Sequence, residues 1–142
     1  MAVENPEIEE LFQALQTKRS NEKLAQAANN EGLHLMEKGD VTGAVVRFRE
    51  AKKLGPTIAA VHGNLGVALL SAGDLAGAEE ELGEARNLEP SNPSAYFYLG
   101  VVMEKRGALT QAISLYQKAL QLNPSFVEAK EALEKTRRTM RT

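Results

Sequence analysis

The sequence contains no cysteine, and no apolar run approaches the length of about 18 residues that a membrane-spanning helix needs. The missing thiols exclude disulfide bonds, thiolate metal sites and thiol catalysis. An excess of one charge is also missing, because 17 Lys and Arg residues stand against 19 Asp and Glu residues, giving a net charge of −2. Dedicated nucleic-acid-binding proteins usually carry a basic excess. We therefore expect no nucleic-acid partner and no membrane insertion.

The beginning of the chain also lacks a targeting pattern. A secretory signal has a basic segment followed by an apolar one, and the first ten residues have neither. The expected compartment is therefore the cytoplasm.

Residues that could support catalysis are scarce. His34 and His62 are the two histidines, and neither lies in a pattern typical of a catalytic triad, a zinc site or a phosphate-binding loop. The consecutive carboxylates of Glu79, Glu80 and Glu81 would point in different directions on a helix, so we interpret this run as a solvated face. We expect no enzymatic activity, no cofactor and no metal ion.

What the sequence does have is an internal repeat of 34 residues. A glycine at the end of one helix and an aspartate at the start of the next would turn the chain within each copy, as at Gly39-Asp40 and Gly73-Asp74. Apolar residues at helical spacing then predict two helices per copy. Five columns are identical in all three copies: Gly32, Gly66 and Gly100; Gly39, Gly73 and Gly107; Ala44, Ala78 and Ala112; Ala51, Ala85 and Ala119; Pro56, Pro90 and Pro124.

These columns resemble the tetratricopeptide repeat family, whose pattern joins Leu-Gly, a Gly-Asp turn, two alanines and a closing proline over 34 residues. The resemblance extends over about residues 25–126. It implies an all-α fold, a right-handed superhelical solenoid of three helix-turn-helix repeats with an extra N-terminal helix and a C-terminal capping helix. The expected boundaries are an N-terminal amphipathic helix and linker at 1–24, repeats at 25–58, 59–92 and 93–126, and the capping helix at 127–142.

An additional amphipathic helix is predicted before the repeats. Asn5 is suited to cap it, Pro6 to its first turn, and the segment from Thr17 to Lys23 could be a turn or a continuation of the helix. Apolar residues follow at positions i, i+3, i+4 and i+7, and they form one stripe that needs a partner surface. The stripe consists of Ile8, Leu11, Phe12 and Leu15.

The family resemblance also implies a concave groove, formed by the first helix of each repeat, that holds a peptide or a helix. We expect affinity to come from Phe97, Leu33, Val67 and Val101, with Asn29, Asn64 and Lys105 orienting the ligand. Some family members clamp acidic chaperone tails with Lys and Arg. Of the corresponding residues here, which are Asn29, Leu33, Asn64, Ser94 and Tyr98, only Asn64 matches. The full set of groove residues is Asn29, Leu33, Met36, Asn64, Val67, Leu70, Phe97, Val101 and Lys105.

Two functional hypotheses follow from the sequence. In the first, the chain is a non-catalytic adaptor or scaffold that binds a protein or peptide ligand in the groove. In the alternative, the chain assembles with itself, because the N-terminal stripe fills its own groove or that of a neighbour and produces a homo-oligomer.

Overall fold

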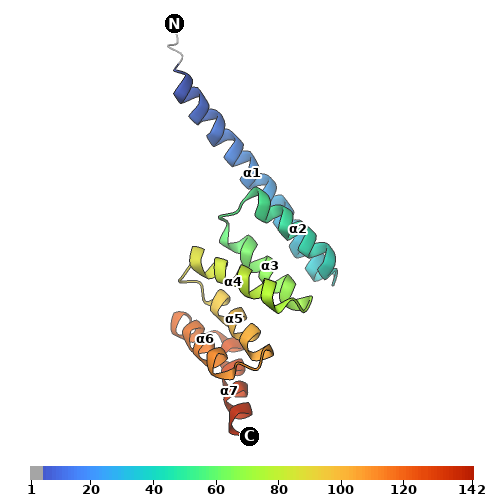
Figure 1. Ribbon diagram of the computed structural model, residues 1–142, viewed down its shortest axis with the longest axis vertical. Helices are drawn as coiled ribbons and strands as arrows, with labels where there is room; N and C mark the ends of the chain where they lie inside the picture. The colour runs from blue at the N-terminus through green and yellow to red at the C-terminus, as the bar shows by residue number, and fades with distance from the viewer. Residues whose placement is uncertain (1–4) are drawn as a thin grey trace.

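The chain folds into α-helices joined by short turns, as the repeat pattern predicts (Figure 1). A computed structural model describes residues 5–142, and within this range there are seven helices and no β-strand. Residues 1–4, which begin the expected N-terminal segment, lie outside the described residues. The helices are α1 (Pro6–Glu37), α2 (Val41–Leu54), α3 (Ala59–Ser71), α4 (Leu75–Leu88), α5 (Pro93–Lys105), α6 (Leu109–Leu122) and α7 (Val127–Arg141).

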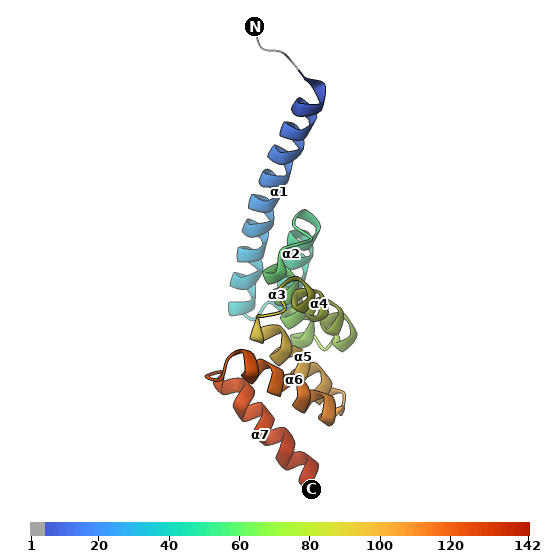
Figure 2. The same ribbon diagram turned by 90° about the vertical axis from the view of Figure 1, so that its left-hand side faces the viewer.

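The helices pack in pairs, and the pairs stack in chain order. The second half of α1 packs against α2, α3 against α4, and α5 against α6, while α2 also contacts α3 and α4 contacts α5 (Figures 1 and 2). Helix α7 closes the stack by packing against α6. Each pair contacts only its neighbours, which is the arrangement of a solenoid. The described chain is therefore elongated, with its two ends far apart (Figure 2).

The turn inside each pair depends on a glycine with a left-handed backbone. Gly39, Gly73 and Gly107 have φ angles of 82°, 85° and 78°, a region that costs other residues energy. Asp40 and Asp74 follow the first two glycines, and their side chains accept hydrogen bonds from backbone amides in the first turns of α2 and α4. Ala108 stands at the corresponding place before α6, which has no side-chain cap.

The two helices of a pair approach closely where the first helix carries a glycine. A Cβ atom added to Gly66 would lie 2.6 Å from Cγ of Leu82, and one added to Gly100 would lie 2.5 Å from Cε1 of Tyr116. Leu82 and Tyr116 are almost completely buried. The glycine column therefore makes room for one large side chain of the partner helix, which fills the interior of the pair.

Helix α1 continues without a break through the region that the sequence left open. It runs over 32 residues, and the segment from Thr17 to Lys23 is helical. The N-terminal helix is therefore an extension of the first repeat helix rather than a separate element. Asn5 caps α1 by accepting a hydrogen bond from the Glu7 amide. At 1.5 Å per residue the helix is about 48 Å long, and residues 5–20 are all exposed (Figure 2).

Candidate functional site

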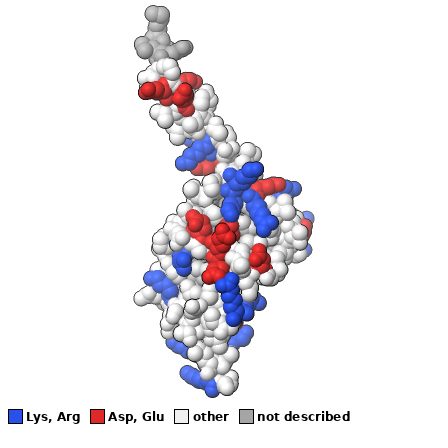
Figure 3. Space-filling view, in the orientation of Figure 1, with Lys and Arg blue, Asp and Glu red and all other residues white. Residues whose placement is uncertain are grey.

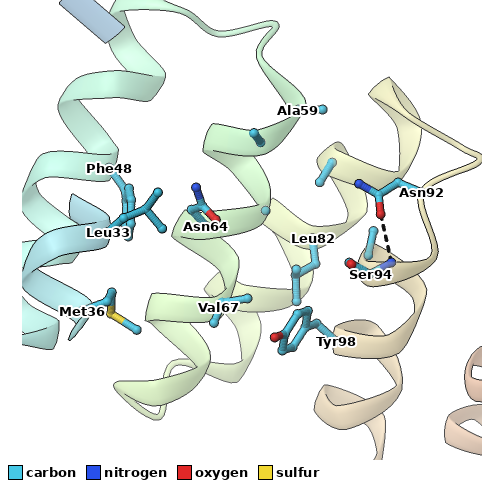
Figure 4. A pocket seen from close by; sticks show the side chains of 14 residues that line it. Leu33, Met36, Phe48, Ala59, Asn64, Val67, Leu82, Asn92, Ser94 and Tyr98 are labelled. Carbon is cyan, nitrogen blue, oxygen red and sulfur yellow. Dashed lines mark hydrogen bonds between the residues drawn. The ribbon is translucent and has the colours of Figure 1, made fainter. Parts of the chain in front are cut away.

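A pocket of about 380 Å³ opens between the first helices of the three pairs. Leu33 and Met36 enter it from α1, Asn64 and Val67 from α3, and Tyr98 from α5 (Figure 4). We call this the central pocket. It is lined by Leu33, Met36, Phe48, Ala59, Ala60, Gly63, Asn64, Val67, Leu82, Ala85, Asn92, Ser94, Ala95 and Tyr98.

The central pocket is uncharged. Among the described residues that line it there is no Lys, Arg, Asp or Glu. Its middle wall is α3, whose sequence from Ala59 to Ser71 also contains none of these residues. Leu33 remains 40% exposed although it is apolar, so part of the lining is accessible to a ligand. An apolar hollow with a few polar groups is typical of a ligand-binding surface.

The two asparagines assigned to ligand orientation are joined to each other. Nδ2 of Asn64 donates a hydrogen bond of 2.9 Å to Oδ1 of Asn29. Asn29 is buried, with 3% of its surface exposed, whereas Asn64 is half-buried and lines the central pocket. The bond links α1 to α3 across two repeats, so Asn29 supports the wall and Asn64 is the asparagine that a ligand can contact.

Phe97 and Val101 do not line the central pocket. The ring of Phe97 lies 5.8 Å from that of Tyr116 and 5.1 Å from that of Phe126, measured between centroids. Val101 packs in the same cluster, which also includes Leu133 of α7. The helical spacing placed both residues on the correct face of α5. At the last repeat, however, this face is covered by the closing helix and the turn before it.

The remaining predicted groove residues lie at the margins. Leu70 packs against the core formed by α2, α3, α4 and α5 and is half-buried, so it supports the fold. Lys105 is exposed at the end of α5 and does not line the central pocket. Of the nine residues predicted, Leu33, Met36, Asn64 and Val67 are brought together around the central pocket.

Sequence reasoning gave less weight to the small residues that shape the pocket. Ala59, Ala60 and Gly63 form one face of α3, and Asn92 and Ser94 border the pocket at the start of α5. The signal that could have found them was the absence of charge along the whole of α3. A surface helix usually carries a charged face, so a helix without one is an indication of a covered or binding surface.

The apolar stripe of α1 is exposed along its length. The exposed fractions are 64% for Ile8, 65% for Leu11, 54% for Phe12 and 57% for Leu15. The stripe does not fill the central pocket of its own chain, which was one form of the self-assembly hypothesis. The reason is the unbroken α1, which holds the stripe away from the stacked pairs (Figures 1 and 2).

A buried polar network ties the second pair to the first. Nε2 of His62 donates to the carbonyl oxygen of Pro56 at 2.6 Å, and Nδ1 lies 2.7 Å from Oε2 of Glu81. Lys52 forms an ion pair with the same carboxylate. Glu81 is only 6% exposed, so its interpretation as part of a solvated face was wrong. Both ring nitrogens are engaged, which leaves neither to act as a base for a nucleophile.

A second polar cluster joins α5, α6 and α7. Oε1 of Glu104 accepts hydrogen bonds from the hydroxyl of Tyr116 at 3.1 Å and from that of Thr136 at 2.9 Å. Burial raises the pKa of Tyr116 above its ordinary value of 10, and the negative charge of Glu104 and the hydrogen bond to it raise it further. This cluster fixes the closing helix, since Thr136 is buried on α7.

The described residues also limit other kinds of site. Within residues 5–142, no group of three or more His, Cys, Asp or Glu side chains is arranged to hold a metal ion. None of the helices in this range combines the length and apolar character required to cross a bilayer.

Comparison with protein families identifies the class of protein that this fold defines. The tetratricopeptide repeat model matches residues 29–87 and 64–125, which together span most of the chain. The chain therefore belongs to the tetratricopeptide repeat family. A search of curated proteins found no match.

Solved structures agree with this assignment at the level of the fold. The first TPR of Spaghetti (RPAP3), bound to the HSP90 peptide SRMEEVD, is 21% identical, with a TM-score of 0.81 over 85% of this chain and 96% of that one. The Arabidopsis OM64 TPR domain is 24% identical, with a TM-score of 0.82 over 84% and 98%. The Sgt2 TPR domain from Aspergillus fumigatus is 20% identical, with a TM-score of 0.78 over 82% and 79%.

Proposed function

We propose that this chain is a non-catalytic interaction module that holds a peptide or a helix of another protein in the central pocket. The observation that carries the proposal is an uncharged, partly exposed pocket built jointly by α1, α3 and α5. Membership of a family of interaction repeats, and a structural neighbour with a bound peptide, support it.

The chemistry of the lining favours an apolar anchor residue in the ligand. Leu33, Met36, Val67 and Tyr98 offer apolar surface, and Asn64 offers an amide that can bind the ligand backbone. Burial of one large apolar side chain contributes about 1.5–3 kcal/mol. Because ordering the ligand opposes part of this gain, we expect affinities near micromolar, or about −8 kcal/mol.

The same lining disfavours an acidic chain terminus. The peptide bound to the RPAP3 neighbour, SRMEEVD, contains three acidic residues. At the clamp positions this chain carries Asn29, Leu33, Asn64, Ser94 and Tyr98, none of which is a cation. A carboxylate moved from water into this pocket would find no opposite charge to compensate its lost hydration. We therefore expect the ligand segment to be uncharged where it enters the pocket.

Selection from a random peptide library tests this function directly. Wild-type protein should enrich peptides with a large apolar residue, and synthetic versions of them should bind with micromolar affinity. Leu33→Lys should lose that binding, because it places a charge in the lining. Val46→Lys is the matched control, since Val46 is an exposed valine of α2 that does not line the pocket.

The same selection can reject the central pocket as the binding site. If no peptide is enriched, or if Leu33→Lys and Val46→Lys bind the selected peptides equally well, the central pocket is not the binding site. SRMEEVD serves as the acidic comparison peptide, and tight binding of it would contradict the expected preference for uncharged ligands.

A further inference from the structure

We propose that one occupant of the central pocket is the N-terminal stripe of a second copy of this chain, so that the protein associates head to tail. This inference rests on the proposed function in one respect, because it uses the same pocket. It adds a specific partner, which is the helical segment carrying Ile8, Leu11, Phe12 and Leu15.

The stripe has the form of a helix that binds in a groove. Its four side chains follow the i, i+3, i+4, i+7 spacing typical of such ligands, and each is more than half exposed. They lie on helix α1, and its residues 6–20 are all exposed. Because the stripe already lies on a folded helix, it loses little conformational entropy on binding, which favours association.

The central pocket has the form of the complementary groove. Ala59, Ala60 and Gly63 lie along one face of α3 and border the pocket. Small side chains let a second helix backbone approach closely, and the neighbouring Leu33 and Val67 then contact its apolar residues (Figure 4). The lining of the central pocket and the four side chains of the stripe are all uncharged, so the two surfaces are chemically complementary.

The pocket that accepts the stripe must belong to another molecule. Leu33, in the pocket, and Leu11, in the stripe, are on the same continuous helix. They are separated by 22 residues, which corresponds to about 33 Å along α1. Because a straight helix cannot fold back on itself, the stripe of one chain cannot reach its own pocket.

Charge also favours docking into the groove over parallel pairing of two stripes. Glu7, Glu9 and Glu10 lie in the first turns of α1, and acidic side chains gather at this end of the molecule (Figure 3). Parallel pairing of two α1 helices would bring both acidic groups together. Beyond the edge of the central pocket, by contrast, Lys105 lies seven residues after Tyr98 on the same face of α5, about 10 Å away along the helix. We therefore expect the acidic turn to lie towards Lys105.

The geometry has a consequence for stoichiometry. Donor and acceptor surfaces are different, and each chain has one of each, so the contact is heterologous. Such a contact continues from molecule to molecule until it forms a ring or an open filament. Wild-type mass measured by sedimentation should therefore increase with concentration between about 1 µM and about 1 mM, the range set by micromolar affinity.

Two variants, each disabling one surface, provide the test. Phe12→Asp removes the stripe at an exposed residue, and Leu33→Lys disables the pocket. Each variant alone should associate at least about 10-fold more weakly, and Val46→Lys should behave as wild type. An equimolar mixture of Phe12→Asp and Leu33→Lys should form a dimer that does not grow, because one intact stripe meets one intact pocket.

The possible results separate this inference from its rivals. Association that survives Leu33→Lys but not Phe12→Asp, with no mixed dimer of the two variants, would mean that the stripes pair with each other. Wild type that stays monomeric up to about 1 mM would overturn the inference altogether. The peptide selection can be repeated on Phe12→Asp, whose pocket is intact. Enriched peptides there, together with a monomeric wild type, would leave the proposed function standing.

Discussion

Single residues decide how closely the helices of a pair approach. Gly66 of α3 faces Leu82 of α4, and an added Cβ would lie within 3 Å of two Leu82 side-chain atoms. Gly66→Ala should therefore lower the free energy of unfolding, because overpacking costs about 1–3 kcal/mol and outweighs the gain in helix propensity of about 1 kcal/mol. Gly83→Ala in α4 is the matched control. Its Cβ would meet nothing closer than Arg86 Nη2 at 4.0 Å.

Chemical denaturation monitored by circular dichroism distinguishes the two glycines. We expect Gly83→Ala to be stabilising by up to about 1 kcal/mol, since only helix propensity changes. Equal effects of the two substitutions would show that the close approach at Gly66 is not a constraint.

The buried hydroxyl of Tyr116 predicts a loss of stability in alkaline solution. Its folded-state pKa is raised, chiefly by burial and then by Glu104. Below pH 10 the phenol is protonated in both states, but above about 10 the unfolded chain releases the proton while the folded chain keeps it. The free energy of unfolding should therefore fall as the pH rises above 10. Tyr116→Phe should make this decline shallower.

Phenolate absorbance provides an independent measurement for Tyr116. The difference between the alkaline titrations of wild type and Tyr116→Phe isolates this residue, and its ionisation should coincide with unfolding. An ionisation completed while the helices remain intact would contradict the assigned burial.

At the scale of single residues, the sequence predicted local features such as helix ends and caps better than it predicted which side chains contact one another. It identified Gly39 and Gly73 as helix ends and Asp40 and Asp74 as caps, because these effects are local. It misplaced Phe97, since helical periodicity indicates which face a residue occupies but not which element covers that face. The ring of Phe126, which covers Phe97, comes from a turn 29 residues later.

Among the helices, α6 differs from α2 and α4 at its start. Ala108 provides no acceptor, whereas Asp40 and Asp74 bond the amides of Gly43 and Gly77 at 2.9 Å. Ala108→Asp should raise the free energy of unfolding by about 0.5–2 kcal/mol, the usual value of an N-cap. Ala108→Val offers no acceptor and should give no gain when both are measured by chemical denaturation.

A glycine stands three residues after each capping aspartate, and its absence in α6 limits the stability gain expected from Ala108→Asp. A Cβ on Gly77 would lie 2.5 Å from Oδ2 of Asp74, and α6 has Gln111 at the corresponding position. We therefore expect a gain near the lower limit for Ala108→Asp. No gain at all, with the fold unchanged, would show that Gln111 prevents the capping conformation.

The continuation of α1 through the segment from Thr17 to Lys23 could have been predicted from the composition of that segment. The segment from Thr17 to Lys23 contains neither glycine nor proline, so nothing in it ends a helix. The alternative prediction, that the chain turns here, rested on the polarity of this segment. Polarity, however, reflects exposure here, and most of this segment is exposed on the surface of α1.

For the whole molecule, the two ends of the stack should respond differently to truncation. Residues 5–13 are all exposed, whereas α7 covers Tyr116 and carries the buried Leu133. Deletion of residues 1–13 should leave the midpoint of thermal unfolding unchanged at concentrations where the protein is monomeric. Deletion from residue 127 onwards should lower the free energy of unfolding by at least about 3 kcal/mol, because large apolar side chains become exposed.

Differential scanning calorimetry of both truncated proteins measures this asymmetry. A large destabilisation after the N-terminal deletion would mean that the start of α1 contacts the stack in solution. An unchanged midpoint after loss of α7 would mean that the closing helix does not stabilise the array.

The unbroken helix α1 has a mechanical consequence, because one rigid rod carries both Phe12 and the pocket residues Leu33 and Met36. The orientation of the free tip relative to the cavity is therefore set by the backbone of a single helix. A second molecule that held the tip would sit at one fixed angle to the first, so successive molecules would be related by the same screw operation.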